Sequence, residues 1–428
     1  MTDHTDLRLA AQYEAYPYPH RDPREEAKRL IVGSPGHLRE IDHWLFGATR
    51  PASLPLRALI AGGGTGDATI MLAQQMARDG RAGAVTWLDR SSAALKIAQA
   101  RAANRGLTNI VWEQRSILDL PASGLGPFDY IDCCGVLHHL PDPEAGLSAL
   151  LSVLAPGGGI GLMVYAPYGR TGIYMIQEGL RLLAPAHEEP AARLDVARRV
   201  MKHLPETAWL RTNRSVTDHL NGGDAGLYDL LLNPRDQAYT VPRLHDLLAR
   251  AGLSVACWVE PIRYDPIPLL PDPKLRARIA TLSSVERAAL AEALAGNIAA
   301  HIVYCTRAGE VLARADPLNP DTVPICREMT GQDLAKGIQA NNTLFVGLDG
   351  LRVPVAVPPM AGAILRLVDG KRSVGEIGAL LTSRSTSAEA FSRAWSSLFS
   401  ALEAINRLLL AAPNGGRAPG HAPPPDAT

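Results

Sequence analysis

Short apolar runs alternate with longer segments of helical spacing between residues 57 and 307. The runs read ALIAG (58–62), AVTWLD (84–89), NIVWEQ (109–114), YIDCCGV (130–136), GIGLMVYA (159–166), SVACWVE (254–260) and HIVYCTR (301–307). Between them, segments such as SSAALKIAQARAANRG (91–106) carry apolar residues every three to four positions. The alternation predicts an α/β fold, a mainly parallel sheet with helices on both faces. LAPGGG (154–159) is expected to end a helix before the fifth strand.

Changes in composition divide the chain into four parts. Residues 1–50 form a polar arm with an aromatic cluster, which we expect to act as a lid, and residues 51–307 form the α/β domain. A partly helical insertion at 167–253 follows a strand end, where such insertions often cap a substrate site. Residues 308–412 are predicted to form a small α+β unit, and the Pro- and Gly-rich residues 413–428 a disordered tail.

Composition narrows the range of partners. Lys plus Arg and Asp plus Glu number 43 each, so the formal net charge of zero argues against a polyanion such as nucleic acid. No run approaches the roughly 18 apolar residues of a membrane helix, and the N-terminus lacks an apolar signal core. We therefore expect a cytoplasmic protein that binds no membrane. The five cysteines show no CxxC spacing, and no metal site is expected.

The glycine-rich segment LIAGGGTG (59–66) lies between the first predicted strand and a helix. A dinucleotide fingerprint GxGxxG fails, because counting from Gly62 and Gly64 its last position is Asp67, and a P-loop fails for want of its Lys-Ser/Thr. What remains is GxGxG, with its third glycine at Gly66. Asp89 ends the second strand, where a carboxylate can accept both hydroxyls of a ribose. A glycine loop and a ribose carboxylate without phosphate-binding residues indicate S-adenosylmethionine.

These motifs resemble those of class I S-adenosylmethionine-dependent methyltransferases. YEAYPYP (13–19), LIAGGGTG, GVLHHLPDPEAGLSALLSVLAPGG (135–158) and NPRDQAYTVPRLHDLLARAGL (233–253) are similar to a bacterial type 11/12-like subgroup with an N-terminal YxxxPYP motif, over residues 12–307. The resemblance implies a Rossmann-like seven-stranded sheet of order 3-2-1-4-5-7-6 with strand seven antiparallel. It also implies a set of cofactor-binding residues: Gly62, Gly64, Thr65, Gly66, Asp89, Arg90, Ser116, Ile117 and Gly135.

Two positions depart from the pattern of many class I enzymes. Ile60 stands where an acid often ends strand one, and Ser116 where an Asp often lies near adenine. The change at 60 removes an indirect contact to the methionine amino group, whereas Ser116 can still accept a hydrogen bond from the adenine amine. We expect weaker binding rather than its loss.

Candidates for the acceptor side flank the expected sulfonium. His138 and His139 follow strand four, where one of them could act as a general base or both could merely shape the loop. Tyr13 and Tyr18 could close over the cofactor with the rest of the aromatic arm, or pack their rings on the domain. Tyr165 and Arg170 follow strand five, and Arg235, Asp236 and Tyr239 lie in the insertion. Such an Arg-Asp-Tyr set could recognise a carboxylate or peptide backbone, lie on the solvated surface, or form a structural ion pair.

The C-terminal unit suggests a second activity. Residues 353–381 predict an extended piece, a helix from about Pro359, a turn at Asp369 and Gly370, and a helix near Ser373, and they resemble the winged-helix peptide-chaperone domains of the PqqD type. This unit would recruit a polypeptide by pairing with a strand edge, or serve homodimerisation or packing. The predicted function is methyl transfer to a protein or peptide side chain or a small metabolite, and the alternative is a non-catalytic cofactor-binding scaffold that recruits a partner.

Overall fold

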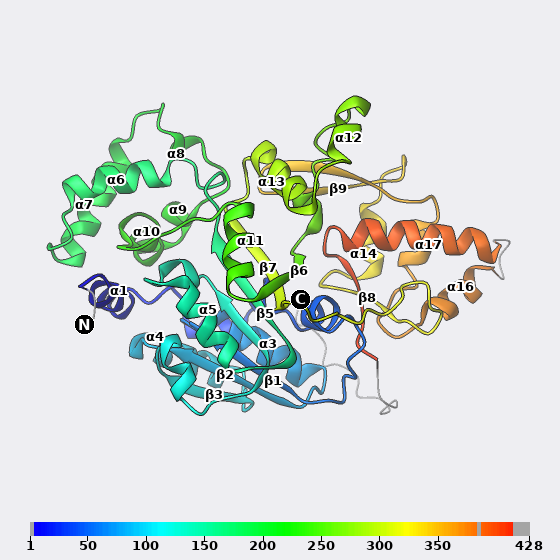
Figure 1. Ribbon diagram of the computed structural model, residues 1–428, viewed down its shortest axis with the longest axis horizontal. Helices are drawn as coiled ribbons and strands as arrows, with labels where there is room; N and C mark the ends of the chain where they lie inside the picture. The colour runs from blue at the N-terminus through cyan, green and yellow to red at the C-terminus, as the bar shows by residue number, and fades with distance from the viewer. Residues whose placement is uncertain (1–3, 383–386, 414–428) are drawn as a thin grey trace.

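The computed structural model describes residues 4–382 and 387–413, and a seven-stranded sheet lies at its centre (Figure 1). The strand order is β3-β2-β1-β4-β5-β7-β6, and β7 runs antiparallel to both of its neighbours. The predicted order and the antiparallel seventh strand are confirmed. Of the predicted tail, all but Pro413 lies outside the described residues. The strands are β1 (Leu56–Ala61), β2 (Gly83–Asp89), β3 (Ile110–Gln114), β4 (Phe128–Cys134), β5 (Leu154–Tyr165), β6 (Leu253–Trp258) and β7 (Ala300–Arg307).

Helices pack on the sheet around two apolar cores. One core joins the segment 38–46 to α3 through Leu72 and Met76, and the other joins α5 to α11 through Leu150 and Leu247. This two-sided burial explains why the strands read as continuous apolar runs. The helices that flank the sheet are α3 (Asp67–Arg78), α4 (Ser92–Asn104), α5 (Pro143–Ser152) and α11 (Val241–Arg250).

The start of β5 corrects one prediction. Helix α5 ends at Ser152, and LAPGGG belongs to the first part of β5 rather than to a separate helix stop. The pairing with β4 shifts there, from Phe128 opposite Leu154 to Tyr130 opposite Gly159. The glycines form an irregularity within the strand, because residues without side chains tolerate a bulge.

The arm and the insertion lie together on one side of the sheet (Figure 1). Helix α1 (His4–Ala15) contacts α4, and Tyr16 stacks on Tyr228 of the insertion with ring centroids 5.2 Å apart. The arm is therefore packed between the insertion and the edge of the α/β domain. The helices of the insertion are α6 (Ile173–Leu183), α7 (Pro190–His203), α8 (Trp209–Thr212), α9 (Asp218–Asn221) and α10 (Gly223–Leu232).

The C-terminal unit has a core of its own at the opposite end of the molecule from α1 (Figure 1). A hairpin of β9 and β10 precedes three helices, and Gly370 with a φ of +74° makes the predicted turn. The likeness to a winged helix remains a prediction. The elements are β8 (Pro324–Cys326), α14 (Gly331–Gly337), β9 (Thr343–Leu348), β10 (Leu351–Ala356), α15 (Ala361–Leu365), α16 (Val374–Thr382), α17 (Ala388–Glu403) and β11 (Leu408–Leu410).

Glu40, in the short helix α2 (Leu38–Glu40), joins this unit to the α/β domain. Its fully buried carboxylate accepts hydrogen bonds from Tyr304 at 2.7 Å and Asn406 at 2.6 Å, and it pairs with Arg327. Removing one partner of a buried pair typically costs several kcal/mol, about 3–5. The two units therefore form one structure that truncation would disrupt.

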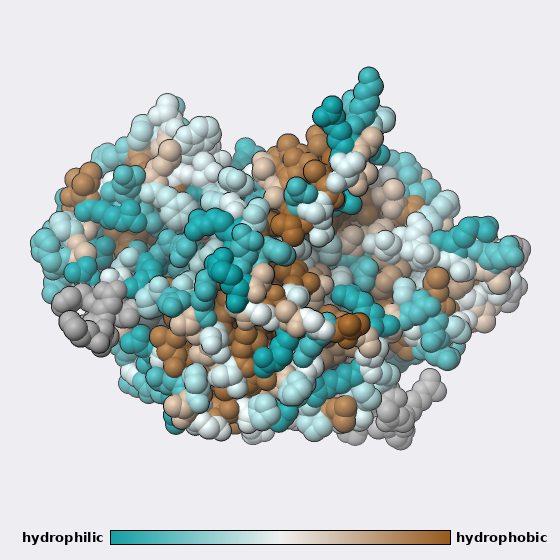
Figure 2. Space-filling view, in the orientation of Figure 1, coloured by the Kyte–Doolittle hydropathy of each residue, from teal (hydrophilic) through white to brown (hydrophobic). Residues whose placement is uncertain are grey.

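The outer surface is mixed in character. On the face shown in Figure 2, hydrophobic residues gather around α13 (Ser284–Ala295) and the base of α12 (Pro273–Ile279), where Leu275 and Leu294 are exposed. Within the described ranges, no helix combines the length and the hydropathy needed to cross a membrane.

Candidate active site

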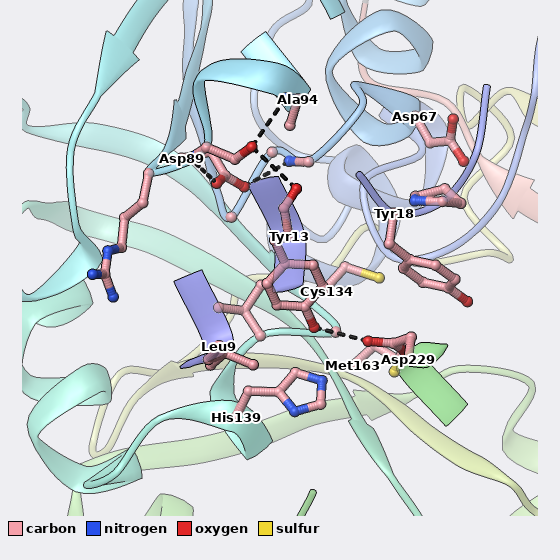
Figure 3. A pocket seen from close by; sticks show the side chains of 18 of the residues that line it. Leu9, Tyr13, Tyr18, Asp67, Asp89, Ala94, Cys134, His139, Met163 and Asp229 are labelled. Carbon is pink, nitrogen blue, oxygen red and sulfur yellow. Dashed lines mark hydrogen bonds between the residues drawn. The ribbon is translucent and has the colours of Figure 1, made fainter. Parts of the chain in front are cut away.

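A cavity of about 950 Å³ opens at the carboxyl ends of β1, β2 and β4. Its wall combines the glycine loop, the N-terminal arm, and residues 215–218 and 229 of the insertion. Ligands of open α/β sheets bind at this edge, where strand order reverses. Figure 3 shows Asp89, Tyr13, His139 and Asp229 facing this space from four different segments.

The glycine loop brings bare backbone to the cavity wall. Gly62 and Gly64 have φ values of +85° and +47°, and both line the cavity. A Cβ on Gly62 would lie 2.2 Å from Val136, and a Cβ on Gly63 would lie 2.2 Å from the Trp87 ring. A Cβ on Gly64 would lie 2.9 Å from the carbonyl oxygen of Tyr18, so this glycine also lets the arm approach the loop. The loop geometry thus needs glycine for both conformation and packing.

Asp89 ends β2 with a carboxylate that faces the cavity. One oxygen accepts the Gly64 N–H at 2.8 Å, and the other accepts the Ser91 N–H at 3.0 Å. Burial raises the pKa of Asp89, although these backbone bonds oppose the shift. Since a carboxylate has about four acceptor positions, each oxygen keeps one for a ligand.

The far wall, beside β3, suits a flat apolar group. Ser116, Ile117 and Leu118 line it, with Arg90 and Arg115 at the edge. The Ser116 hydroxyl accepts the Leu118 N–H at 3.2 Å, so it caps a 3₁₀ turn and keeps a second lone pair. Gly135 lines the cavity after β4.

The arm closes the cavity from outside. Tyr13, Tyr18 and Pro19 line it, as do Leu9, Ala10 and Ala11 of α1. The Thr65 hydroxyl donates to the Pro19 carbonyl at 2.7 Å, and therefore anchors the arm rather than facing the cavity. Gly66 also lies off the wall, where a Cβ would come within 3.0 Å of Ala98.

Ion pairs hold the arm against the helix that follows the glycine loop. Arg21 donates three hydrogen bonds to Asp67, the shortest at 2.6 Å, and Arg101 reaches the same carboxylate at 2.6 Å. Arg101 also pairs at 2.6 Å with Glu26 of the arm, and both side chains are almost fully buried. Asp67, which argued against a dinucleotide at this loop, is a structural partner of the arm. Glu14 adds a contact by accepting the backbone N–H of Ser92 at 3.1 Å.

The side of the cavity nearest the insertion is acidic and aromatic. Asp229 of α10 is 3% exposed and accepts hydrogen bonds from Tyr13 at 2.9 Å, Asn233 at 3.1 Å and Tyr165 at 3.3 Å. Burial and the charge of Asp229 raise the pKa of Tyr13, so both tyrosines remain hydrogen-bond donors. Burial and the same charge raise the pKa of Asp218.

The two histidines occupy different environments. His139 lines the cavity, and its Nδ1 lies 2.6 Å from the Arg235 carbonyl oxygen. A carbonyl only accepts, so Nδ1 carries the proton and Nε2 is the free acceptor of the neutral ring. His138 is fully buried behind the wall, and neither ring nitrogen has a hydrogen-bond partner among the described residues. Burial lowers the pKa of His138, which keeps it neutral.

Arg170 forms a structural ion pair. Its guanidinium lies 2.8 Å from Asp236, both groups are buried, and it stacks 3.6 Å above the Tyr165 ring. Tyr239 is buried in the core between α11 and the sheet. Asp236 thus takes part in an ion pair, and Arg170 also lines the cavity, so acceptor recognition by this set stays a prediction.

The structure therefore places most predicted site residues on one cavity, and Thr65, Gly66 and His138 behind its wall. The sequence reasoning missed Asp132, Asp218 and Asp229, which also line it. A visible signal existed for two of them, because Asp132 interrupts an apolar strand and Asp229 an apolar helix.

Comparison with known proteins identifies the family. The family model of a methyltransferase domain matches residues 59–160. An uncharacterised protein of Synechococcus sp. is 32% identical over 298 residues, which cover 69% of this chain and 70% of that protein. The chain belongs to the class I S-adenosylmethionine-dependent methyltransferases.

Two further comparisons give a shorter sequence match and a similar fold. The ubiquinone biosynthesis O-methyltransferase of Albidiferax ferrireducens is 36% identical over 88 residues, which cover 21% of this chain and 34% of that enzyme. The structure of PKMT2 from Rickettsia typhi in complex with AdoHcy has a TM-score of 0.63 at 15% identity and covers 88% of this chain and 75% of that one. This second likeness shows the shared fold.

The cavity fits the cofactor of a class I methyltransferase, S-adenosylmethionine. Asp89 can accept the ribose hydroxyls, and the wall at Ser116 and Ile117 can flank adenine. The bare loop at Gly62 and Gly64 leaves room for the rest of the molecule. The cavity, of about 950 Å³, has the size of a ligand site, and its lining continues from the glycine loop to Asp229.

Proposed function

We propose that this methyltransferase transfers the methyl group of S-adenosylmethionine to an amine of a positively charged acceptor. The observation that carries the proposal is Asp229, a buried carboxylate on the cavity wall whose three hydrogen-bond donors are all neutral. A buried charge is normally paired, and an amine would supply the pairing cation. Arg170, which also lines the cavity, is already paired with Asp236.

The aromatic groups beside Asp229 support the same acceptor. Tyr13, Tyr18 and Tyr165 line the cavity, and aromatic ring faces attract ammonium and sulfonium groups. Asp218 adds a second carboxylate to the cavity lining. A carboxylate-bearing acceptor would meet two like charges here, so the wall selects by charge.

Different residues of the chain have different roles in the proposed reaction. When bound at the glycine loop, S-adenosylmethionine would supply a methyl group attached to a sulfonium sulfur. The lone pair of the amine would displace the sulfur from the methyl carbon in one step, and the electrons of the carbon–sulfur bond would stay on sulfur. Asp229 orients the amine, and the tyrosine hydroxyls hold the carboxylate in place. The amine must also lose a proton, and Nε2 of His139 is the free acceptor on the same wall. The arm excludes water.

The acceptor belongs to a protein, a peptide or a small metabolite. The oxygen acceptor named for the ubiquinone enzymes does not carry over, because the chain covers only 34% of the enzyme from Albidiferax ferrireducens. A polypeptide recruited by the C-terminal unit would have to cross the molecule, since that unit lies at the opposite end from α1 (Figure 1). We propose that this unit serves mainly to pack against the segment 38–46 through Glu40.

Asp229→Asn tests the proposal, with Asp224→Asn as the matched control. Asp224 lies on the same helix, but its carboxylate pairs with Arg198 at the surface. With the full chain, labelled cofactor and cell lysate, Asp229→Asn should lower label transfer about 10-fold or more while S-adenosylhomocysteine affinity stays unchanged. The control should transfer label normally. Undiminished transfer to amines by Asp229→Asn would refute the role of this carboxylate.

A further inference from the structure

A second carboxylate on the cavity wall also lacks a cation. Asp132 of β4 is fully buried, and its Oδ2 accepts a hydrogen bond from the Tyr130 hydroxyl at 2.9 Å. Its Oδ1 has no hydrogen-bond partner among the described residues. An unsatisfied buried polar atom costs about 1–3 kcal/mol, and more when it is charged. Packing alone gives no reason for such a group, whereas a bound ligand would.

Asp132 differs in this respect from Asp67, which lies on the same wall. Asp67 is held by Arg21 and Arg101 at 2.6 Å each, so its charge is already balanced. The Tyr130 hydroxyl, which is neutral, is the only polar group that bonds Asp132 through its side chain in the described structure. Asp132 is therefore the carboxylate at this end of the cavity that is free to bind a cation.

The strand register places Asp132 where the proposed placement of the cofactor puts its amino acid part. In that placement Asp89, at the end of β2, binds the ribose, and Ser116 and Ile117 flank adenine on the β3 side. The remainder of the molecule then extends in the opposite direction, over β1 and β4. Ile60 of β1 pairs directly with Asp132 of β4, and both residues line the cavity.

We propose that Asp132 binds the α-ammonium group of the methionine part of S-adenosylmethionine. The assignment rests on the proposed placement of the cofactor across the sheet. It explains how the chain manages without an acid at Ile60, because the neighbouring strand provides a carboxylate at the same level. Burial raises the pKa of Asp132 to about 7, and an adjacent ammonium favours the ionised form and so lowers that pKa again.

Two ligands and one isosteric variant test this assignment. S-adenosylhomocysteine carries the α-ammonium, and the analogue with hydrogen in place of the α-amino group lacks it. Calorimetry with the full chain measures both dissociation constants for the wild type and for Asp132→Asn, whose amide oxygen can still accept from Tyr130. Asp42→Asn is the control, since Asp42 is a buried carboxylate paired with Arg81 away from the cavity.

The wild type should bind the deaminated analogue about 10- to 100-fold more weakly than S-adenosylhomocysteine. Asp132→Asn should lose a similar factor for S-adenosylhomocysteine and show no further loss with the analogue, while Asp42→Asn behaves as the wild type. Ile60→Asp combined with Asp132→Val should restore part of the affinity by moving the carboxylate to β1. If Asp132→Asn does not fold, Asp132→Ser provides the same comparison.

Equal weakening of both ligands by Asp132→Asn would show that Asp132 only shapes the loop, and it would overturn the assignment. Unchanged affinity for S-adenosylhomocysteine would overturn it as well. Neither result affects the proposed amine methylation, which is measured by label transfer and by Asp229→Asn. If the wild type transfers no label but binds both ligands with the expected affinities, the proposed function is refuted and the assignment of Asp132 is not.

Discussion

Asp89→Asn exchanges the carboxylate that we expect to bind the ribose for an amide of nearly the same shape. The carboxylate now accepts the N–H groups of Gly64 at 2.8 Å and Ser91 at 3.0 Å, and the ribose hydroxyls would occupy the remaining acceptor positions. The amide keeps one acceptor oxygen and turns a donor toward the other position. A hydrogen bond to a charged group contributes about 1.5–3 kcal/mol, so the loss of one ribose bond should weaken cofactor binding about 10- to 150-fold.

The same substitution should change stability little. Burial already raises the pKa of Asp89, which means that the folded protein holds the charged group at a disadvantage that an amide removes. The lost backbone bond offsets this gain, and the net change should stay within about 1 kcal/mol. Calorimetry with S-adenosylhomocysteine and thermal unfolding measure the two effects separately.

Asp129→Asn should show the reverse pattern. Asp129 lies near the start of β4, at the end of the sheet away from the cavity. It accepts the Arg57 backbone N–H at 2.9 Å and pairs with Arg57 and Arg50. This control should melt at a lower temperature and bind the cofactor within about twofold of the wild type, because distant sites act independently. Equal affinity of Asp89→Asn and the wild type, or equal weakening by both variants, would refute the reasoning.

Three more predictions concern the arm and the buried acid. Arg21→Gln should raise KM for S-adenosylmethionine about 10-fold, because it removes the ion pair that holds the arm to Asp67. Arg24→Gln alters an exposed ion pair and should leave KM unchanged. Equal KM values for the two variants would show that the Arg21–Asp67 ion pair is unimportant for cofactor binding. Deleting residues 1–20 should lower kcat far more than the melting temperature, and full turnover would contradict the closing role of the arm. Because burial raises the pKa of Asp132 to about 7, its proton stabilises the ligand-free fold fully below about pH 4, and this contribution is lost as the pH rises to about 7. Over this pH interval the free energy of unfolding of the wild type should therefore fall relative to that of Asp132→Asn. A difference between the two free energies that does not depend on pH would exclude the raised pKa.

The sheet could be predicted because its information is local. The inner parallel strands β1, β2, β4 and β5 are largely buried and read as apolar runs. The order of strands followed from the resemblance carried by the glycine loop and Asp89. The prediction for LAPGGG was wrong because glycine and proline are typical both of a helix end and of a strand bulge. Only the pairing of Gly159 with Tyr130 in the structure shows that this segment is a bulged part of β5.

The acceptor side could not be predicted because it is assembled from distant segments. Tyr13 and Asp229 are 216 positions apart, and nothing in either local sequence indicates their contact. His138 and His139 are adjacent and chemically identical, so only the backbone after β4 decides which one faces the cavity. Asp132 could be seen in the sequence as a charged residue in an apolar strand. Its proposed role in cofactor binding, however, depends on its pairing with Ile60, which only the structure shows.

Transfer of labelled methyl from S-adenosylmethionine is the most direct test of the central claim. The full chain would be incubated with methyl-labelled cofactor and cell lysate, with Asp89→Asn as the control, and the label would be followed into macromolecules and small molecules together with the release of S-adenosylhomocysteine. The structure predicts label in a product that resists mild base, as N-methyl groups do and methyl esters do not, and a large reduction in the control. Release of no S-adenosylhomocysteine above the control, or label found on oxygen, would contradict amine methylation at this site.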